Sequence, residues 1–359
     1  MTRVRLGDVA REVRKRTLES SDLPTVGLEH LDSGEVELTR WNEGVETTFT
    51  KEFEKGQVLF GRRRAYLHKA VVAPFDGVCS GDITVIAAGD GLSPRLLPFI
   101  IQNDALFKHA VEKSAGSLSP RVKWQGLAEF EIELPGIQAQ EGLADVLWAA
   151  QETKRRYKRL LATCDDVVKS QFVEMFEGKE YPSSCLSTLV SSMRNGLSPS
   201  KSGSHRSKVL TLSAITQGHF DSSAWKDGFF TEEPPADKRV SNEDFYVCRG
   251  NGNKHLVGTG EYSNVPMKDM VFPDTMIAAR IKQEQIILPY LRCAWNRPST
   301  RKQIEASAKT TNGTFKINQT ALGNIKLLVP PLELQQEFAD FATSVDKSKF
   351  KLGICGGML

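Results

Sequence analysis

The amino-acid sequence predicts an α+β protein made of two similar mixed α/β domains, each followed by a helix, the first of which is unusually long. Three observations support this fold class. The phrase at residues 115–141 returns at residues 312–337. In both copies, a short alternating run leads through proline into a helix-forming run. After the first copy, no proline occurs between residues 138 and 176.

The repeat keeps a constant offset along its clearest part. Arg121 corresponds to Lys316 and Asp145 corresponds to Asp340, each 195 residues later. A fainter similarity upstream has a shift of 184, which is expected if the two copies differ in loop length. Each copy is far longer than the roughly 20 to 50 residues of a solenoid repeat. The sequence therefore predicts a duplicated domain.

Each copy combines strands and helices. Apolar residues alternate with polar ones over residues 130–134 and again over residues 325–329, which is the period-two pattern of a half-buried strand. The glycine-bounded runs KGQVLFG and GDITVIAA also predict strands, whereas residues 96–115 predict one helix of about five turns. Pro135 and Pro330 mark the passage from strand to helix, because proline suits a helix start but not a central strand.

A long helix of about 60 Å is predicted over residues 137–178, and a shorter second helix over residues 332–350, before a glycine-rich tail at residues 351–359. Apolar residues at heptad spacing would let the two helices pack against each other. The residues predicted to pack are Leu143, Leu147, Ala150, Tyr157, Leu161, Val168, Leu334, Phe338, Phe341 and Val345. The alternative is a long surface helix that lies on its own domain. Residues 1–136 and 179–331 are then the two domains.

Composition limits the class of protein. Hydrophobic residues make up 40% of the chain and charged residues 25%, as in an ordinary globular protein. No apolar run reaches the roughly 18 residues of a membrane span, and the N-terminus lacks the apolar stretch of a secretory signal. Six cysteines without a Cys-x-x-Cys pair fit a reducing cytoplasm. With a net charge of +3, any nucleic-acid surface must be local.

The sequence contains no recognisable catalytic motif. It lacks a phosphate-binding P-loop, a Gly-x-Ser-x-Gly elbow, a His-Glu-x-x-His helix and the Asn/Asp-Pro-Pro-Tyr tetrad of amino-methyltransferases. Its six histidines have no metal-ligand spacing. Asp274 and Glu284 would be a conceivable nuclease pair, but the usual Glu-x-Lys is missing. We therefore expect neither catalytic residues nor a bound metal ion.

Basic and small polar residues gather at matching places in the two copies. Arg62, Arg63 and Arg64 follow a predicted strand, and Arg121 lies in a loop whose repeat carries Lys316. Arginine and lysine neutralise phosphates, and the planar arginine fork also matches the guanine edge. The alternative is a set of solvated surface turns. The residues predicted to bind DNA are Arg62, Arg63, Arg64, Tyr66, Lys69, Ser117, Ser119, Arg121, Lys123, Asn251, Asn253, Lys254, Lys309, Asn312, Thr314, Lys316 and Asn318.

The two runs ELPGIQAQE and LVPPLELQQE resemble the Leu-Pro-Pro-Leu-x-Glu-Gln run of specificity subunits of type I restriction-modification systems. With the duplicated domains, this resemblance covers nearly the whole chain. It implies two target recognition domains in a pseudo-two-fold arrangement, each reading one half of a split double-stranded DNA site. Long antiparallel, coiled-coil-like spacer helices would set the distance between the half-sites. The second helix departs from the family pattern in its short length and glycine-rich end.

The resemblance also implies partners for this chain. It would be non-catalytic and bind no cofactor, while two methyltransferase (modification) subunits would bring S-adenosylmethionine. Restriction subunits would bring ATP- and magnesium-dependent translocation and cleavage, in the cytoplasm and away from any membrane. The residues alone leave two other functions open. One is a self-contained endonuclease or methyltransferase with unrecognised motifs, and the other is a coiled-coil adaptor that never touches nucleic acid.

Overall fold

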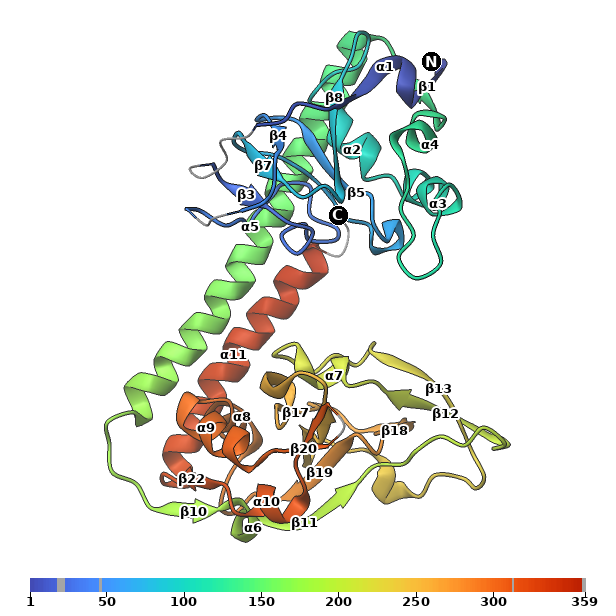
Figure 1. Cartoon of the computed structure of the whole chain (residues 1–359). Coiled ribbons are helices and arrows are strands. Elements are labelled where there is room, and N and C mark those ends of the chain that lie inside the picture. Colours follow the sequence, from blue (N-terminus) through green and yellow to red (C-terminus); the bar gives the residue numbers. More distant parts are fainter. Residues whose placement is uncertain (18–22, 45–46, 312, 357–359) are drawn as a thin grey trace. The chain divides into compact units, whose positions relative to one another are not determined.

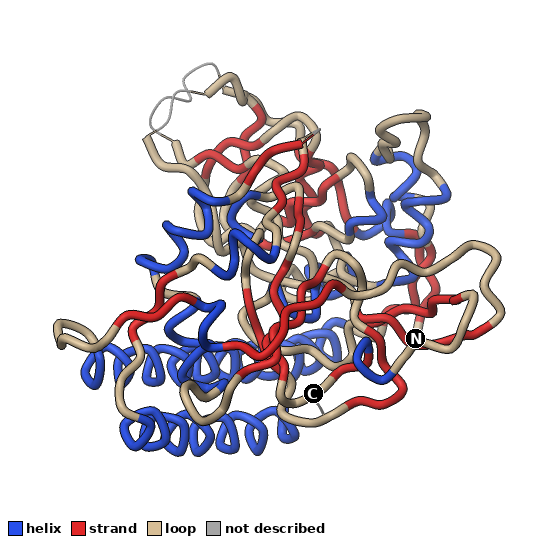
Figure 2. The backbone as a smooth tube through the Cα atoms, turned by 90° about the horizontal axis from the view of Figure 1, so that it is seen from below, coloured by secondary structure: helices blue, strands red, loops and turns tan. Residues whose placement is uncertain are grey.

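The chain forms two compact units that divide inside a long helix, unit 1 from Met1 to Arg156 and unit 2 from Tyr157 onward. Figure 1 shows the elements of both units, and Figure 2 distinguishes their helices from their strands. Among the described residues, no helix has both the length and the apolar character needed to cross a bilayer. The structure is a computed structural model that describes residues 1–17, 23–44, 47–311 and 313–356.

Unit 1 is built from short strands with helices around them. Its strands are β1 (Thr2–Arg5), β2 (Ala10–Val13), β3 (Thr25–Val26), β4 (Lys51–Phe53), β5 (Val58–Gly61), β6 (Ala70–Val72), β7 (Gly77–Cys79), β8 (Ile83–Ala88) and β9 (Glu131–Leu134). Its helices are α1 (Leu6–Val9), η1 (Ala65–Leu67), α2 (Leu97–Ile101), α3 (Asp104–Glu112), α4 (Trp124–Ala128) and the first part of α5 (Ile137–Phe176). The sheets have the orders β2-β8-β5-β6, β3-β7-β4 and β1-β9.

Unit 2 uses the same kinds of element with longer strands. Its strands are β10 (Ser183–Cys185), β11 (Val190–Asn195), β12 (His205–Leu210), β13 (Trp225–Phe230), β14 (Arg239–Val240), β15 (Asp244–Cys248), β16 (Gly250–Asn251), β17 (Gly260–Tyr262), β18 (Met267–Val271), β19 (Met276–Ile281), β20 (Lys309–Thr311), β21 (Thr314–Lys316) and β22 (Lys326–Leu328). Its helices are α6 (Leu186–Leu189), α7 (Ser213–Thr216), η2 (Ala236–Lys238), η3 (Lys254–Leu256), α8 (Leu288–Trp295), α9 (Pro298–Ser307), α10 (Gln319–Gly323) and α11 (Leu332–Gly356). The sheets have the orders β11-β19-β15-β17, β13-β12-β18-β14, β16-β21-β20 and β10-β22.

The two units share one frame, so the predicted duplication is confirmed. The sheet β2-β8-β5-β6 has the same order as β11-β19-β15-β17, and the pair β1-β9 corresponds to β10-β22. The cores match as well, since Leu6 and Leu127 are fully buried in unit 1 and Leu186 and Leu322 in unit 2. The strands predicted around β9 and β22 are therefore confirmed. The sheets β3-β7-β4 and β13-β12-β18-β14, by contrast, differ in strand number.

Two predicted helix boundaries are wrong. Residues 96–115 form α2 and α3 rather than one helix. The Asn103 side chain accepts a hydrogen bond from the Ala105 amide at 2.8 Å and so caps the start of a new helix. The second long helix continues to Gly356 instead of ending at residue 350, because an isolated glycine costs a helix only about 1 kcal/mol.

A buried glutamine fixes the start of α5 against unit 1. The Gln140 carbonyl oxygen accepts a hydrogen bond from the Ser93 amide at 2.9 Å. The Gln140 NH2 group donates to the carbonyl oxygens of Gly91 at 2.8 Å and Pro135 at 2.9 Å. Three hydrogen bonds therefore tie the first turn of the helix to the loop after β8 and to the proline after β9.

Unit 2 repeats this arrangement 195 residues later with Gln335. Its carbonyl oxygen accepts from the Ile287 amide at 3.1 Å. Its NH2 group donates to the carbonyl oxygens of Gln285 at 3.2 Å and Pro330 at 2.8 Å. The glutamine in the repeated phrase therefore anchors a long helix to its own globular body, which explains why the phrase occurs twice.

The first half of α5 packs on unit 1. The Trp148 indole donates a hydrogen bond to the Arg95 carbonyl at 2.9 Å, and its ring meets Phe99 edge-on with 5.1 Å between centroids. Leu143 and Ala150 are exposed, so the prediction that these two residues pack is wrong. A straight helix drifts by about 20° per heptad from a seven-residue line, and here the packed face is the one that carries Trp148.

The last turns of α5 pack against α11 within unit 2 (Figures 1 and 2). Phe338 of α11 lies 5.3 Å from Phe172 and 5.7 Å from Phe176 between ring centroids. Further along, Lys349 pairs with Asp165, so the helices run antiparallel as predicted. Of the predicted packing residues, Val168 and Phe338 are buried. Those that are half-buried are Leu147, Tyr157, Leu161, Leu334, Phe341 and Val345.

Candidate nucleic-acid interface

The three consecutive arginines of unit 1 follow β5 and enter three different environments. Arg62 is partly buried. Arg63 donates a hydrogen bond from Nε to the Ser119 hydroxyl at 2.6 Å. Arg64 is exposed, has a left-handed φ of 55°, and donates its amide to the Pro120 carbonyl at 2.8 Å. The structure thus brings the arginine run together with the loop that carries Ser119 and Pro120.

Asp82 links the arginine run to this loop. Its carboxylate accepts from Arg121 at 2.7 Å (Nε) and 3.3 Å (Nη2), and lies 3.5 Å from Nη1 of Arg63. The hydrogen bond from Arg121 is the main reason that the pKa of Asp82 lies below its ordinary value. The carboxylate is therefore ionised at neutral pH, and the contribution of this pair is lost only as the pH falls below about 4.

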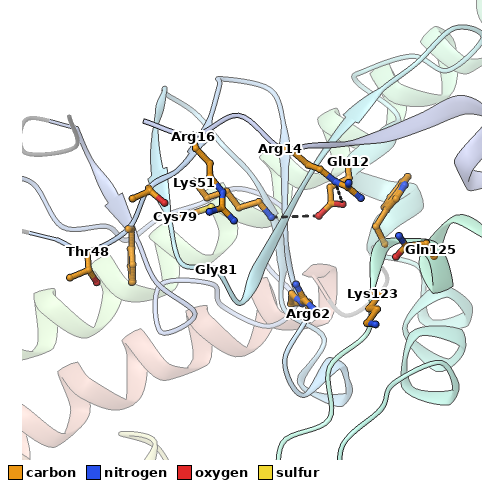
Figure 3. A pocket seen from close by; sticks show the side chains of 13 residues that line it. Glu12, Arg14, Arg16, Thr48, Lys51, Arg62, Cys79, Gly81, Lys123 and Gln125 are labelled. Atoms are coloured by element: carbon orange, nitrogen blue, oxygen red, sulfur yellow. Dashed lines mark hydrogen bonds and ion pairs between the residues drawn. The ribbon is translucent and has the colours of Figure 1, made fainter. Parts of the chain in front are cut away.

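A pocket of about 580 Å³ opens beside these arginines. Its lining contains five basic side chains, Arg14, Arg16, Lys51, Arg62 and Lys123 (Figure 3). Among the described lining residues, the only carboxylate is that of Glu12, which lies 2.9 Å from Arg14 and 3.7 Å from Lys51. The pocket therefore has an excess of positive charge suited to an anion such as a phosphate.

Arg62 and Lys123 are the predicted site residues that reach this pocket. The Nε atom of Arg62 is buried, and nothing in the described part of the chain accepts a hydrogen bond from it. A buried donor without an acceptor is unfavourable by about 1–3 kcal/mol. A bound phosphate would reduce the charge repulsion among the basic side chains of the pocket.

Two groups in the pocket wall have pKa values shifted by burial. Burial lowers the pKa of Lys51, whose Nζ donates to the Ile83 carbonyl at 2.8 Å. Burial also raises the pKa of the Cys79 thiol to about 12, so the thiol remains protonated at neutral pH. The protonated thiol is a poor nucleophile, so Cys79 is a structural residue of the pocket wall.

Sequence reasoning missed Arg14, Arg16 and Lys51. The first two belong to the basic run REVRKR at the end of β2, which is visible in the sequence but did not indicate a shared site. Lys51 comes from β4, in a different sheet from β5, the strand that Arg62 follows. Only the folded chain brings these segments together.

The predicted residues of unit 2 occupy a similar edge. Lys316 of β21 lies opposite Gly250 on one side and opposite Lys309 on the other. In unit 1, Arg121 likewise forms antiparallel backbone bridges to residues on both of its sides. Lys309 and Lys316 are both exposed. The similar placement supports the correspondence between these two basic residues that the repeat predicts.

Three predicted asparagines of unit 2 have local structural roles. The Asn251 side chain accepts from the Asn253 amide at 2.9 Å, and the Asn253 side chain accepts from the His255 amide at 3.0 Å. The Asn318 side chain accepts from the Ala321 amide at 2.8 Å and caps α10. Helix and turn capping is the usual role of asparagine at such positions, and it occupies the side-chain oxygen in each case.

The remaining predicted residues are more scattered. Tyr66 is 52% exposed at η1. Lys69 donates to the Leu28 carbonyl at 2.7 Å, so its ammonium group already has a partner within unit 1. Ser117 and Lys254 are exposed, and Thr314 is half-buried. Asn312 lies outside the described residues.

The fold defines a class of protein in which one α+β unit occurs twice and a single long helix contributes residues to both copies. No family model matches the chain. The chain is 23% identical over 137 residues to the type I restriction enzyme EcoDI specificity subunit of Escherichia coli, a match that covers 37% of this chain and 30% of that protein. The match therefore spans about a third of the curated relative's length.

Solved structures give the fold likeness. The S subunit of a type I restriction-modification system from M. genitalium matches with a TM-score of 0.57 and 13% identity, covering 99% of this chain and 92% of that chain. A chain from a study of assembly of the type I restriction-modification system matches with a TM-score of 0.45 and 17% identity, covering 99% and 95%. The predicted resemblance to type I specificity subunits is thus confirmed, and this chain has the fold of the M. genitalium S subunit.

Proposed function

We propose that this chain is a non-catalytic, sequence-specific DNA-binding subunit that reads a bipartite double-stranded site. The observation that carries the proposal is the duplicated frame with a basic edge at the same place in each unit. Two similar readers suit a split DNA site because each can occupy one half-site. The similarity to type I specificity subunits in part of the sequence and in fold supports the same function.

We assign residues 1–136 and 179–331 as the two target recognition domains and α5 and α11 as the spacer helices. In this proposal the chemistry is supplied by separate subunits. Two methyltransferase subunits bring S-adenosylmethionine, and restriction subunits bring ATP- and magnesium-dependent activity. The absence of recognisable catalytic motifs in the sequence is consistent with this division of labour.

Replacing Arg62 by alanine is expected to weaken binding to the specific site about tenfold to a hundredfold, which corresponds to about 1–3 kcal/mol. The Arg62 side chain lines the basic pocket of unit 1 together with four other basic side chains. Fluorescence anisotropy with labelled duplexes, measured over a salt series, gives both the affinity and the number of phosphate contacts, because log affinity falls by about 0.9 per contact for each unit of log salt.

Arg3→Ala is the matched control, since it removes the same charge from an exposed strand residue that does not line the pocket. Its affinity should stay near that of the unchanged protein. Equal effects of the two substitutions would make Arg62 a contributor of bulk charge only. Cleavage or methylation of plasmid by the pure chain, given magnesium and S-adenosylmethionine, would instead favour a self-contained enzyme.

Asp82→Asn is expected to raise affinity for unrelated DNA while reducing the preference for the specific site. The change removes a negative charge beside Arg63 and Arg121 and loosens the ion pairs that position both guanidinium groups. Competition binding with specific and unrelated duplexes measures the ratio. Asp76→Asn makes the same charge change at an exposed position of unit 1. If Asp76→Asn lowers the ratio equally, positioning by Asp82 is not involved.

A further inference from the structure

The shared frame allows individual positions of the two units to be compared. In unit 1 the Arg62 carbonyl accepts a hydrogen bond from the Val122 amide at 3.0 Å. In unit 2 the Arg249 carbonyl accepts from the Ile317 amide at 2.9 Å in the same way. Both arginines follow the third strand of the shared sheet, β5 or β15. The residues that surround this frame can therefore be paired between the units.

Two positions next to this frame carry different chemistry in the two units. The first position lies at the end of the edge strand of the shared sheet, which is β2 in unit 1 and β11 in unit 2. Unit 1 has Arg14 directly after β2, and unit 2 has Asn195 as the last residue of β11. The second position is the first residue of the short helix that follows Val122 in unit 1 and Ile317 in unit 2. Unit 1 has Trp124 there, in α4, and unit 2 has Gln319, in α10. Arg14 and Trp124 both line the basic pocket. Unit 2 thus replaces a cation and an indole with two amides.

The two amides of unit 2 form a pair. The Gln319 NH2 group donates to the Asn195 side-chain oxygen at 3.2 Å. Both residues are half-buried, so the pair is accessible but held in place. An amide has one carbonyl oxygen and one NH2 group, and the bond leaves the Gln319 oxygen and the Asn195 NH2 group for a ligand. Within the described residues, neither of these two groups has another side-chain or backbone partner.

The cations next to this pair already have partners in unit 2, and Lys238 Nζ donates to the Asn195 backbone carbonyl at 2.9 Å. Arg194, the neighbour of Asn195, turns its guanidinium group to the buried carboxylate of Asp244, with Nη1 at 3.2 Å. Asn318, the neighbour of Gln319, uses its side-chain oxygen to cap α10. The pair therefore presents one side-chain acceptor and one side-chain donor, next to cations that already have hydrogen-bond partners.

We infer that Asn195 and Gln319 are base-reading residues of unit 2 and that together they recognise an adenine edge. In the major groove adenine presents an N6 amino donor and an N7 acceptor, which complement an amide oxygen and an amide NH2 group. The Gln319 oxygen accepts from N6, and the Asn195 NH2 group donates to N7. Unit 1 offers a cation and an indole at the matching place, and the Arg14 guanidinium suits a phosphate or the two acceptors of guanine. This inference rests on the proposed DNA-binding function.

Asn195→Asp gives the sharpest test, because the new carboxylate keeps an acceptor for the Gln319 NH2 group and loses the outward donor, while the negative charge that it adds is matched in the control variant. Full-length protein is incubated with a duplex library in which the half-site read by unit 2 is randomised, and bound sequences are counted. The unchanged protein should prefer adenine at one position. Asn195→Asp should reduce that preference at least tenfold and leave the other positions and the other half-site unchanged.

Gln319→Leu serves as an independent second variant, because it removes the acceptor without adding charge, and it should lose the same preference. Asn242→Asp is the matched control, since it makes the identical chemical change at an exposed turn of unit 2. An unchanged adenine preference in Asn195→Asp and Gln319→Leu overturns the inference, as does an equal loss in Asn242→Asp. If the unchanged protein selects no bipartite sequence at all, the proposed function itself fails, and this outcome is distinct from the others.

Discussion

Replacing Asp244 by alanine is expected to lower the free energy of unfolding of unit 2 by about 3–5 kcal/mol, the usual cost of removing one partner from a buried ion pair. Asp244 is fully buried at the start of β15. Its carboxylate accepts hydrogen bonds from Arg280 Nε at 2.6 Å and from Arg194, and lies 3.4 Å from the Tyr246 hydroxyl. Without Asp244, two partly buried guanidinium groups lose the carboxylate that they share on the sheet β11-β19-β15-β17.

Urea denaturation followed by far-ultraviolet circular dichroism measures this loss as a shift of the unfolding midpoint relative to the unchanged protein. Asp227→Ala is the matched control, because Asp227 also accepts two hydrogen bonds from an arginine, Arg206, but lies on the surface. Exposed ion pairs contribute little to stability, so the control should leave the midpoint almost unchanged. Similar midpoints for the two variants would show that burial of the Asp244 network is unimportant.

Replacing Phe338 by alanine is expected to cost about 3–5 kcal/mol, as for other fully buried aromatic side chains. Phe338 has no exposed surface and contacts Phe172 and Phe176 of α5 from α11. Tyr290 of α8 stacks on the same cluster, with 5.5 Å between its ring centroid and that of Phe172. The cavity left by Phe338 would remove the ring contacts between α11 and α5 in the core of unit 2.

Thermal denaturation of Phe338→Ala, Phe172→Ala and the double variant gives the coupling between the helices. Aromatic pairs contribute about 0.5–1.5 kcal/mol beyond the area they bury, so the double variant should lose less stability than the sum of the single variants. Val173→Ala on the exposed face of α5 is the control and should have little effect. Strictly additive losses would mean that the two rings do not interact energetically.

Much of the fold could be predicted because the duplication doubles every weak signal. A single alternating strand such as β9 is ambiguous by itself, but its repetition as β22 at the same offset makes the assignment secure. The long helix could be predicted from the absence of proline after Pro135. The break at Asn103 could not, because a capping asparagine inside an apolar run also occurs in continuous helices.

The candidate site was only partly predictable. Arg62 and Arg121 stand out because basic residues follow a strand and recur in the second copy. Asp82 did not stand out, since a single aspartate in a loop has no distinctive pattern, yet it orients both Arg63 and Arg121. The pocket draws on β2, β4 and the loop before α4, which meet only through tertiary packing.

The glutamine anchors and the shared sheet separate the conserved part of each unit from the part that varies. Gln140 and Gln335 hold equivalent helices in equivalent ways, whereas the sheets β3-β7-β4 and β13-β12-β18-β14 have diverged in strand number and length. The shared sheet and the anchored helix can therefore stay constant while the other large sheet of each unit changes. Each unit is therefore a self-contained module. Recombination within the segments that encode the shared sheet and the helix anchor would exchange whole modules and leave the attachment of each module to its long helix unchanged.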